Sequence, residues 1–297
     1  MTEETQEMTV AEVLAAFSER GSYRRDAVEA ALAQPEAMIP ELIGLLTQVC
    51  DDPAAFAESR APVYALFLLS HLKATAAHAV IADLLRLGEW AQYLFGDLIT
   101  EEFSTFLYRT YADDPEPAKA LLADRTAGDF ARAVGADVLV YAVAEGRLPR
   151  EEVLSYLSAI LTTEPHDDEW NDIFSLLVYR MSQLHPAEQM DLIRSLYEDE
   201  LVDSMYVDLA DIEQIVNEQS PQETIAQALR EAQATATDEL HDDLEEWVDD
   251  YSYEPELDLA HLLADSRATT NRKAAKKKAK SKRKMAKASR KKNRRKR

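Results

Sequence analysis

The chain has 297 residues, of which 46% are hydrophobic, with only 7 Gly, 11 Pro and one Cys. This composition, rich in Ala, Leu and Glu, argues against a sheet-rich protein and predicts an all-α one. No apolar run approaches the roughly 20 residues that cross a bilayer. The acidic opening MTEETQEM does not resemble a secretory signal peptide. We therefore expect a soluble, cytoplasmic protein with no membrane partner.

The charge is distributed very unevenly. The net charge is −22, yet the last 31 residues contain 18 Lys or Arg and no Asp or Glu. Residues 1–266 therefore carry 15 basic side chains against 55 acidic ones, a net charge of −40. Because this surface repels phosphate groups, we do not expect residues 1–266 to bind nucleic acid.

Residues 1–21 predict one N-terminal helix, and residues 22–199 predict HEAT-like helical pairs. Thr9 and Glu12 form a capping-box pattern that starts a helix at Val10, and Gly21 ends it. The first pair joins a helix over 25–33 to one that Pro40 opens, since proline suits the first helical position.

Residues 60–87 give the clearest helical pair. Apolar side chains recur at helical spacing over 61–72 and over 80–87, on either side of a break at 73–76. The inward positions are Ala61, Tyr64, Ala65, Leu68, Leu69 and Leu72, then Val80, Ile81, Leu84, Leu85 and Leu87. Such a hairpin cannot bury its apolar face alone, so neighbouring pairs must stack on it.

Comparable first helices begin near residues 24, 61, 95, 130 and 169, at intervals of about 35–40 residues. This interval is typical of HEAT-type repeats and predicts a short α-solenoid. The first helix of the third pair is expected over about 94–111, and that of the fifth pair begins at Trp170. An irregular helical bundle is the alternative.

Residues 200–266 predict an acidic, helical C-terminal cap. Residues 238–258 hold eleven Asp or Glu and no Lys or Arg, yet Leu240, Leu244, Trp247, Val248 and Tyr251 form one apolar stripe. We favour docking of this helix on the last repeat, because an exposed Trp is uncommon. The alternative is that the stripe is presented to a partner.

Residues 267–297 have no apolar periodicity and are expected to be disordered. This tail contains no aromatic residues, so it can neutralise phosphates but cannot stack on bases. Any nucleic-acid binding would be independent of sequence and sensitive to salt. The candidate contacts are Lys276, Lys277, Lys278, Lys282, Arg283, Lys284, Arg290, Lys291, Lys292, Arg294 and Arg295.

Gly96 and Asp97 interrupt an otherwise helical segment. The glycine would permit a kink or a close helix contact. Asp97 either caps the resumed helix, which we favour, or faces a ligand together with Thr100 and Glu101. These three residues and Trp247 are the candidate protein-binding residues.

We expect no catalytic, metal or cofactor site. His166 and His241 lie beside acidic residues, but neither has a spacing that holds a defined metal geometry. His71 and His78 flank a predicted turn, where surface placement is expected. Cys50 completes an apolar stripe and should be a buried, unreactive thiol. No phosphate-binding loop or nucleophile–base pattern is present.

Four stretches resemble a family of uncharacterised bacterial proteins, a domain of unknown function. They are YALFLLSHLKA at 64–74, LFGDLITEEF at 94–103, LPREEVLSYL at 148–157 and LVDSMYVDLADIE at 201–213, and the resemblance runs from Leu42 to about Asp211. It implies an α-helical, HEAT-like fold and assigns no activity. Many members of that family end in a cysteine-rich zinc-binding motif. No Cys follows Cys50 here, so no zinc site carries over.

The sequence favours a non-enzymatic scaffold whose acidic repeat surface binds a basic or amphipathic protein segment. The basic tail would tether the scaffold electrostatically or fold back over the acidic body. One alternative is sequence-independent association with nucleic acid or a ribosome through the tail. The other is an enzyme whose site is assembled from dispersed residues.

Overall fold

A computed structural model describes residues 8–19, 21–165, 171–235 and 239–249, together with residues 259 and 262. The predicted basic tail, His166, Trp170 and Tyr251 lie outside the described residues. The chain divides into two compact units, residues 1–253 and 254–297, and the helices described below belong to the first. Within the described residues the elements are all helical, which confirms the predicted all-α class.

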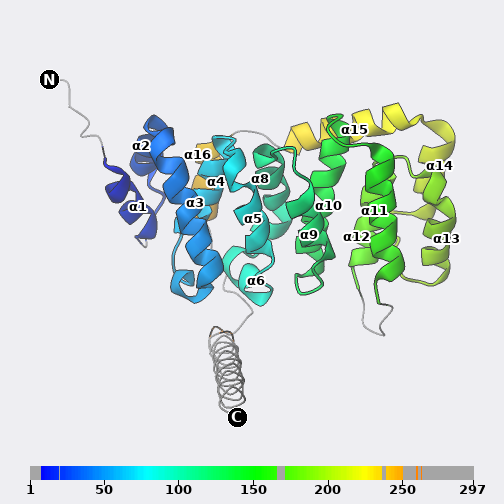
Figure 1. The fold of residues 1–297 in the computed structure, drawn as a ribbon, viewed down its shortest axis with the longest axis horizontal. Helices are drawn as coiled ribbons and strands as arrows, with labels where there is room; N and C mark the ends of the chain where they lie inside the picture. The colour runs from blue at the N-terminus through cyan, green and yellow to red at the C-terminus, as the bar shows by residue number, and fades with distance from the viewer. Residues whose placement is uncertain are drawn as a thin grey trace, which may run out of the picture. The chain divides into compact units, whose positions relative to one another are not determined.

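The helices succeed one another with short connections (Figure 1). Their bounds are α1 Val10–Ser18, α2 Arg25–Ala33, α3 Pro35–Asp51, α4 Ala61–His71, α5 His78–Leu85, α6 Glu89–Phe95, α7 Leu98–Glu101, α8 Phe103–Thr110, α9 Glu116–Ala123, α10 Asp129–Ala144, α11 Arg150–Thr163, α12 Ile173–Ser182, α13 Met190–Glu198, α14 Leu209–Glu218, α15 Pro221–Thr235 and α16 Leu240–Asp249. Three 3-10 turns, Pro53–Phe56, Thr75–Ala77 and Ala187–Gln189, lie between them. No described helix is both long and apolar enough to traverse a bilayer.

The predicted N-terminal helix is confirmed. The Glu12 backbone N–H donates to Thr9 Oγ1 at 3.3 Å, and the Thr9 backbone N–H donates to Glu12 Oε2 at 2.8 Å. This reciprocal capping box satisfies N–H groups that the first turn leaves without partners. Phe17 of α1 stacks on Tyr64 of α4, with ring centroids 4.3 Å apart, so α1 is held against the central helices.

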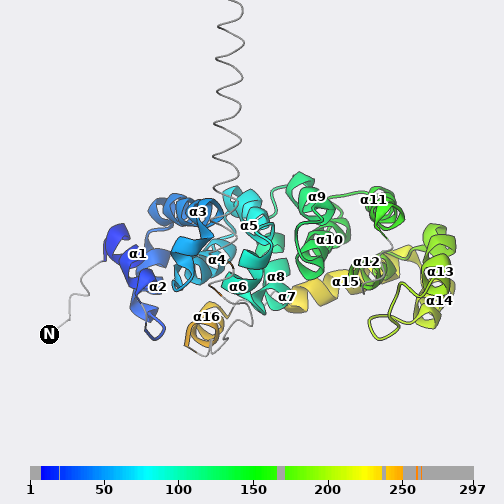
Figure 2. The ribbon, with the colours of Figure 1, turned by 90° about the horizontal axis from the view of Figure 1, so that it is seen from below.

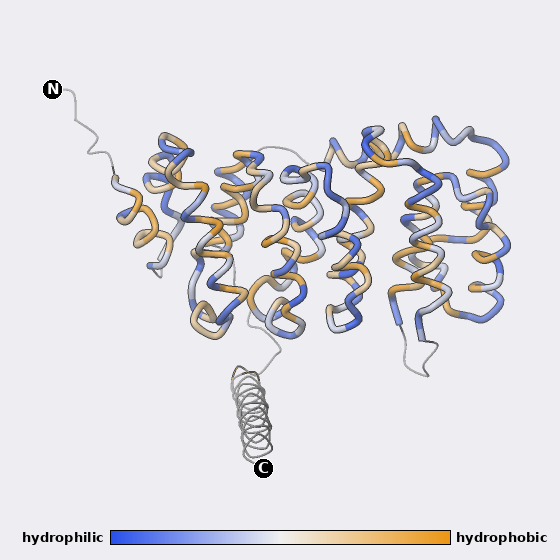
Figure 3. The backbone as a smooth tube through the Cα atoms, in the orientation of Figure 1, coloured by the Kyte–Doolittle hydropathy of each residue, from blue (hydrophilic) through white to orange (hydrophobic). Residues whose placement is uncertain are grey.

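Paired helices form two rows, a compact arrangement compatible with the predicted solenoid (Figure 2). The outer row contains α3, α5, α9 and α11, and the central row contains α4, α8, α10 and α12. Within the central row, α4 contacts α8, α8 contacts α10, and α10 contacts α12. Hydrophobic and hydrophilic residues alternate along most helices, as expected for amphipathic elements (Figure 3).

The central-row helices are buried on more than one side. Every residue of α4 from Ala61 to Ser70 is buried, as is every residue of α10 from Ala131 to Val140. The sequence predicts only one apolar stripe on α4, but Leu66 and Phe67 lie off that stripe and are buried too. Each such side chain contributes about 1.5–3 kcal/mol when removed from water. A second cover must therefore lie on the far side of α4.

Ion pairs join helices within a hairpin and between neighbouring hairpins, at chain separations close to the length of one repeat. Arg132 of α10 donates to Glu164 through two hydrogen bonds of 2.9 and 2.7 Å, and both side chains are buried. Arg180 of α12 pairs with buried Asp137 of α10, which also accepts a hydrogen bond from Ser104 Oγ at 2.6 Å. Further pairs are Arg86–Asp124, Lys119–Glu152, Arg147–Asp113 and Arg150–Glu188. Only the Arg132–Glu164 and Arg180–Asp137 pairs are largely buried, and removing one partner of either would leave a buried charge uncompensated.

Two predicted helix boundaries are wrong. The long helix expected over 94–111 is broken into α6, α7 and α8, because Gly96 adopts φ +47° and ends α6. Glycine reaches this left-handed region at little cost, so it allows a sharp break instead of a kink. The helix expected to open at Pro40 begins at Pro35, and Pro40 lies inside α3, where it removes one backbone donor.

We predict opposite effects for alanine at two helical glycines. A Cβ on Gly135 of α10 would lie 2.6 Å from the Ala118 carbonyl oxygen of α9, so Gly135→Ala should lower the free energy of unfolding by about 1–3 kcal/mol. A Cβ on Gly44 of α3 meets nothing within 4 Å, so Gly44→Ala should raise it by up to about 1 kcal/mol. Urea unfolding measures both, and equal effects would contradict the close α9–α10 approach.

Candidate protein-interaction site

The C-terminal helices turn back along the central row (Figures 1 and 2). Helix α15 contacts α10, and α16 contacts α4. The sequence predicts docking of the acidic helix, which is confirmed, but it favours the last repeat as the docking place, which is wrong. Helix α16 instead supplies the second cover of α4, close to the N-terminal end of the row.

Helix α16 packs through the apolar stripe found in the sequence. Leu240, Leu244 and Val248 recur every four residues and are all buried. Trp247 is half-buried, and its side chain is hydrogen-bonded to the Glu102 carboxylate at the start of α8. The opposite face of α16 carries exposed acidic residues, among them Asp242 and Glu245.

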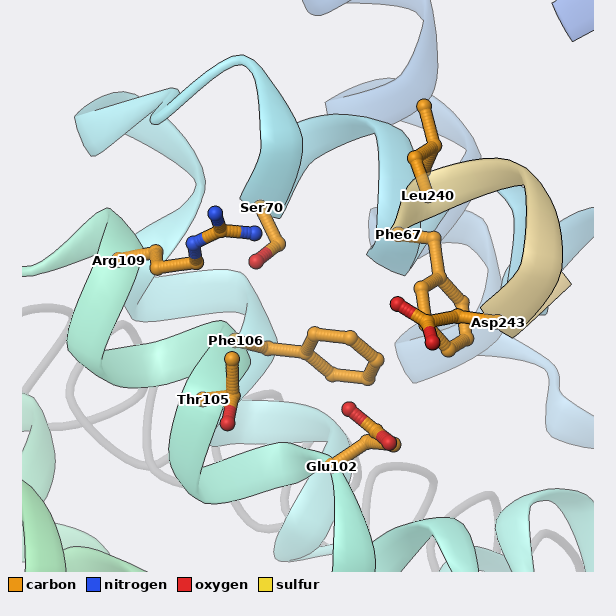
Figure 4. Close-up of a pocket in the computed structure, with 8 residues that line it drawn as sticks. All are labelled: Phe67, Ser70, Glu102, Thr105, Phe106, Arg109, Leu240 and Asp243. Carbon is orange, nitrogen blue, oxygen red and sulfur yellow. The ribbon is translucent and has the colours of Figure 1, made fainter. Parts of the chain in front are cut away.

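A small pocket lies where α16 meets α4 and α8 (Figure 4). It has room for about one water molecule, far less than a metabolite needs. Its lining residues are Phe67 and Ser70 of α4, Glu102, Thr105, Phe106 and Arg109 at α8, and Leu240 and Asp243 of α16. Figure 4 shows the carboxylates of Glu102 and Asp243 both directed into the pocket, near the Phe106 ring.

The pKa of Glu102 is strongly perturbed. Burial, together with the nearby charges of Asp243 and Glu101, raises the pKa of Glu102 to about 7. The hydrogen bond from Trp247 opposes this change by favouring the ionised form, and Glu246 adds further repulsion. The docked position of α16 therefore brings like charges together in a partly buried place.

Ser70 and Arg109 occupy the other end of the pocket (Figure 4). Ser70 is 2% exposed, and its hydroxyl has no hydrogen-bond partner. A buried hydroxyl without a partner costs free energy, on the order of 1–3 kcal/mol. The rings of Phe67 and Phe106 thus give the pocket an apolar lining, and the Ser70 hydroxyl is a buried polar group that lacks a hydrogen bond.

Polar contacts to α2 and the turn before it hold the other side of α16. The Tyr23 backbone N–H donates to Asp249 Oδ1 at 2.5 Å, and the Tyr23 hydroxyl lies 2.5 Å from His241 Nδ1. His241 Nε2 lies 3.1 Å from Glu29 Oε1, which makes an ion pair when the imidazole is protonated. Burial raises the pKa of the Tyr23 hydroxyl to about 12, so it stays neutral.

The structure places the predicted protein-binding residues near this site but not inside the pocket. Asp97, Thr100 and Glu101 are exposed on or beside α7, and Glu101 directly precedes Glu102. The favoured cap is not formed, because the Asp97 side chain makes no hydrogen bond to the first turn of α7. Of the four predicted residues, Trp247 alone hydrogen-bonds to a residue of the pocket.

The histidine and cysteine predictions are corrected in part. His78 is 3% exposed at the start of α5, where burial lowers the pKa of its imidazole and keeps it neutral. Its expected surface position is therefore wrong. Cys50 is half-buried, and burial raises the pKa of its thiol to about 11, which keeps it protonated. Among the described residues, no three His, Cys, Asp or Glu converge as metal ligands would.

Sequence reasoning missed Ser70, Glu102, Arg109 and Asp243 as residues of one site. Glu102 and Asp243 are two among 55 acidic residues, and nothing local distinguishes them. One signal was available for Asp243, because it shares α16 with the predicted stripe and lies four residues before Trp247.

The fold and the site together define an all-α protein of stacked helical hairpins with its own C-terminal helix docked on the central row. The chain belongs to the family described as "Protein of unknown function (DUF1186)", which it matches over residues 8–251. The matched region runs from α1 through α16 and stops before the Lys/Arg-rich tail. This membership agrees with the resemblance found in the sequence.

Two relatives are known from Chlamydia. An uncharacterised protein of Chlamydia trachomatis serovar D is 24% identical over 243 residues, which cover 80% of this chain and 94% of the relative. An uncharacterised protein of Chlamydia muridarum is 24% identical over 243 residues, covering 80% of this chain and 95% of the relative. No solved structure matches the chain.

We predict that Glu102→Gln changes the pH dependence of stability. The pKa of about 7 in the folded protein lies above the ordinary value of 4.5, so Glu102 favours folding most below pH 4.5 and loses that contribution as the pH rises through 7. Gln cannot ionise. At pH 8 the free energy of unfolding of the variant should therefore exceed that of the native protein by about 1 kcal/mol, a figure reduced to allow for solvent screening. At pH 4.5 the two values should be almost equal.

Urea unfolding at both pH values and constant ionic strength measures this difference. Glu41→Gln is the control, because Glu41 is exposed on α3 and is not among the charges that act on Glu102, so its effect should not depend on pH in this way. A Glu102→Gln protein that is less stable than the native one at pH 8 would show that the hydrogen bond from Trp247 outweighs the repulsion.

Proposed function

We propose that this protein is a non-enzymatic interaction scaffold whose repeat surface binds a basic or amphipathic segment of another protein. The observation that carries the proposal is the position of α16: the central row already accommodates an amphipathic helix through buried Leu240, Leu244 and Val248. Helical-hairpin stacks commonly bind extended or helical segments along such a row. We expect the protein to act in the cytoplasm.

The charge of the body supports a basic partner. Residues 1–266 have a net charge of −40, and at least nine of their basic side chains form ion pairs with acids of the same chain. The surplus on the surface is therefore acidic. A positively charged segment would be attracted at long range, which accelerates association and favours it over acidic competitors.

A second candidate function rests on the tail alone. With 18 basic residues in 31 and no aromatic side chain, the tail has the composition of a sequence-independent phosphate-binding segment. In this second function the tail associates with nucleic acid or a ribosome, and the helical body is a rigid domain attached to it. The two functions are compatible, and the first does not need the tail.

We predict that the body retains a protein partner without the tail. The full chain and residues 1–266 are used as baits, with and without nuclease and at graded salt. If the protein is a scaffold, both baits should capture the same partner protein, with or without nuclease. Capture that disappears after nuclease treatment, or when the tail is removed, would favour the second function.

Two charge variants refine this experiment. Asp97→Asn should weaken partner capture about threefold or more without changing thermal stability, because this side chain is exposed beside the site and makes no cap hydrogen bond to α7. Glu41→Gln removes one exposed acid from α3 in the outer row and should leave capture unchanged. Equal losses from both changes would assign the effect to net charge, and no loss from either would exclude the α7 surface.

A further inference from the structure

Three large apolar side chains are exposed to water among the described residues. They are Phe130, in the first turn of α10, and Met205 and Tyr206, in the connection between α13 and α14. Their exposed fractions are 41%, 90% and 38%, in that order. Exposed aromatic and methionine side chains that lie together are typical of protein-binding surfaces.

Both segments meet at the N-terminal end of α12. The Asp129 carboxylate, next to Phe130, accepts hydrogen bonds from the backbone N–H groups of Asp172 and Ile173, where α12 begins. The Tyr206 hydroxyl donates to the Asp172 carboxylate. The exposed apolar side chains therefore lie around the start of one helix, and we call this surface the α12 patch.

Hydrogen bonds fix the connection that carries Met205. The Asp203 backbone N–H donates to Ser175 Oγ of α12 at 2.9 Å, and Asp203 Oδ1 accepts from the Met205 backbone N–H at 2.9 Å. The Tyr197 hydroxyl of α13 donates to the Val207 carbonyl oxygen at 2.5 Å. The connection lies beside α12 (Figure 2). The backbone thus holds the Met205 side chain in water, where burial against a partner would stabilise it.

The surroundings of the α12 patch carry a surplus of negative charge. Residues 198–213 contain seven acidic residues and no Lys or Arg. The cations on and just before the adjoining helices already face acids of the same chain. They are Arg125 with Glu164, Arg132 with Asp129 and Glu164, Arg180 with Asp137, and Arg194 with Asp191 and Glu213. A basic ligand would therefore be attracted to this surface, and an acidic one repelled.

We propose that the α12 patch binds a segment of another protein in which apolar residues alternate with Lys or Arg. This inference rests on the proposed scaffold function and names a surface that the scaffold uses, at α12 and separate from α16. The apolar side chains of the partner would pack on Phe130, Met205 and Tyr206, and its cations would face the acids of residues 198–213. A second copy of this chain is a poorer occupant, because it would bring the same acids together.

Binding of designed peptides to the full chain tests this surface. The probe is a short peptide of alternating leucine and lysine with blocked ends. One matched peptide has serine in place of leucine, and the other has glutamate in place of lysine. Fluorescence anisotropy measures their affinities for the native chain and for three variants.

The variants separate the apolar contact from the charge. Met205→Gln removes the exposed apolar side chain, and Ser204→Lys adds a cation at the exposed position beside it. Glu41→Gln, on α3, is the control, because it changes the net charge by the same amount as Ser204→Lys at a distant exposed position.

The leucine–lysine peptide should bind the native chain about tenfold or more tightly than either matched peptide, because it alone supplies both apolar and basic groups. Met205→Gln and Ser204→Lys should each weaken its binding about threefold or more, and Glu41→Gln should not. Methyl-labelled methionines locate the contact by NMR. The Met205 signal, identified by its loss in Met205→Gln, should shift when the peptide is added, while those of buried Met38 and Met181 should not.

Equal binding by the native chain and Met205→Gln, or an unshifted Met205 signal, would overturn the proposal. Self-association that depends on Met205, measured by light scattering, would also overturn it and assign the patch to a second copy. Thermal unfolding checks that the variants remain folded. If Ser204→Lys does not, Met205→Gln still decides, because its side chain is 90% exposed and contributes little to the core.

The proposed scaffold function can fail separately from this surface. A partner protein captured equally by the native chain and by Met205→Gln would leave the scaffold function standing and overturn the α12 patch. Peptide binding that requires Met205, without any captured partner protein, would support the patch and count against the scaffold.

Discussion

The fold depends on covering α4 from both sides. Ten consecutive residues, Ala61 to Ser70, are removed from water, and a helix that is apolar all round cannot lie at the edge of a two-row stack. The outer row provides one cover through α3, and α16 provides the other. Helix α16, late in the chain, is therefore joined to the early helices by this hydrophobic contact and by the polar contacts of Tyr23 and Glu29.

Most of the fold could be predicted from the sequence, because helix starts and apolar stripes are local. Thr9 and Glu12 set the start of α1, and the stripe of α4 is visible in the chain itself. The break at Gly96 could not be predicted in the same way, since glycine tolerates both a continued helix and a positive φ. The region also breaks a second time at Glu102, between α7 and α8, where no glycine marks the sequence.

The site was harder to predict than the fold. The stripe Leu240, Leu244 and Val248 says that one face of α16 is buried, but it does not say against which helix. The answer depends on a contact such as that between Tyr23 and Asp249, which lie 226 residues apart in the chain. Burial is the largest cause of the raised pKa of Glu102, and Asp243, 141 residues away in the chain, is the next, so no local pattern distinguishes Glu102 from the other acids.

The short connection between α15 and α16 has a consequence of its own. Only four residues separate Thr235 from Leu240, and α15 is itself held on α10. Helix α16 is therefore present beside α4 at an effective concentration in the millimolar range or higher, set by geometry and not by the number of molecules in solution. Even a modest intrinsic affinity keeps it bound. Cutting the chain between the two helices would remove this advantage and leave the contacts between α16 and α4 themselves unchanged.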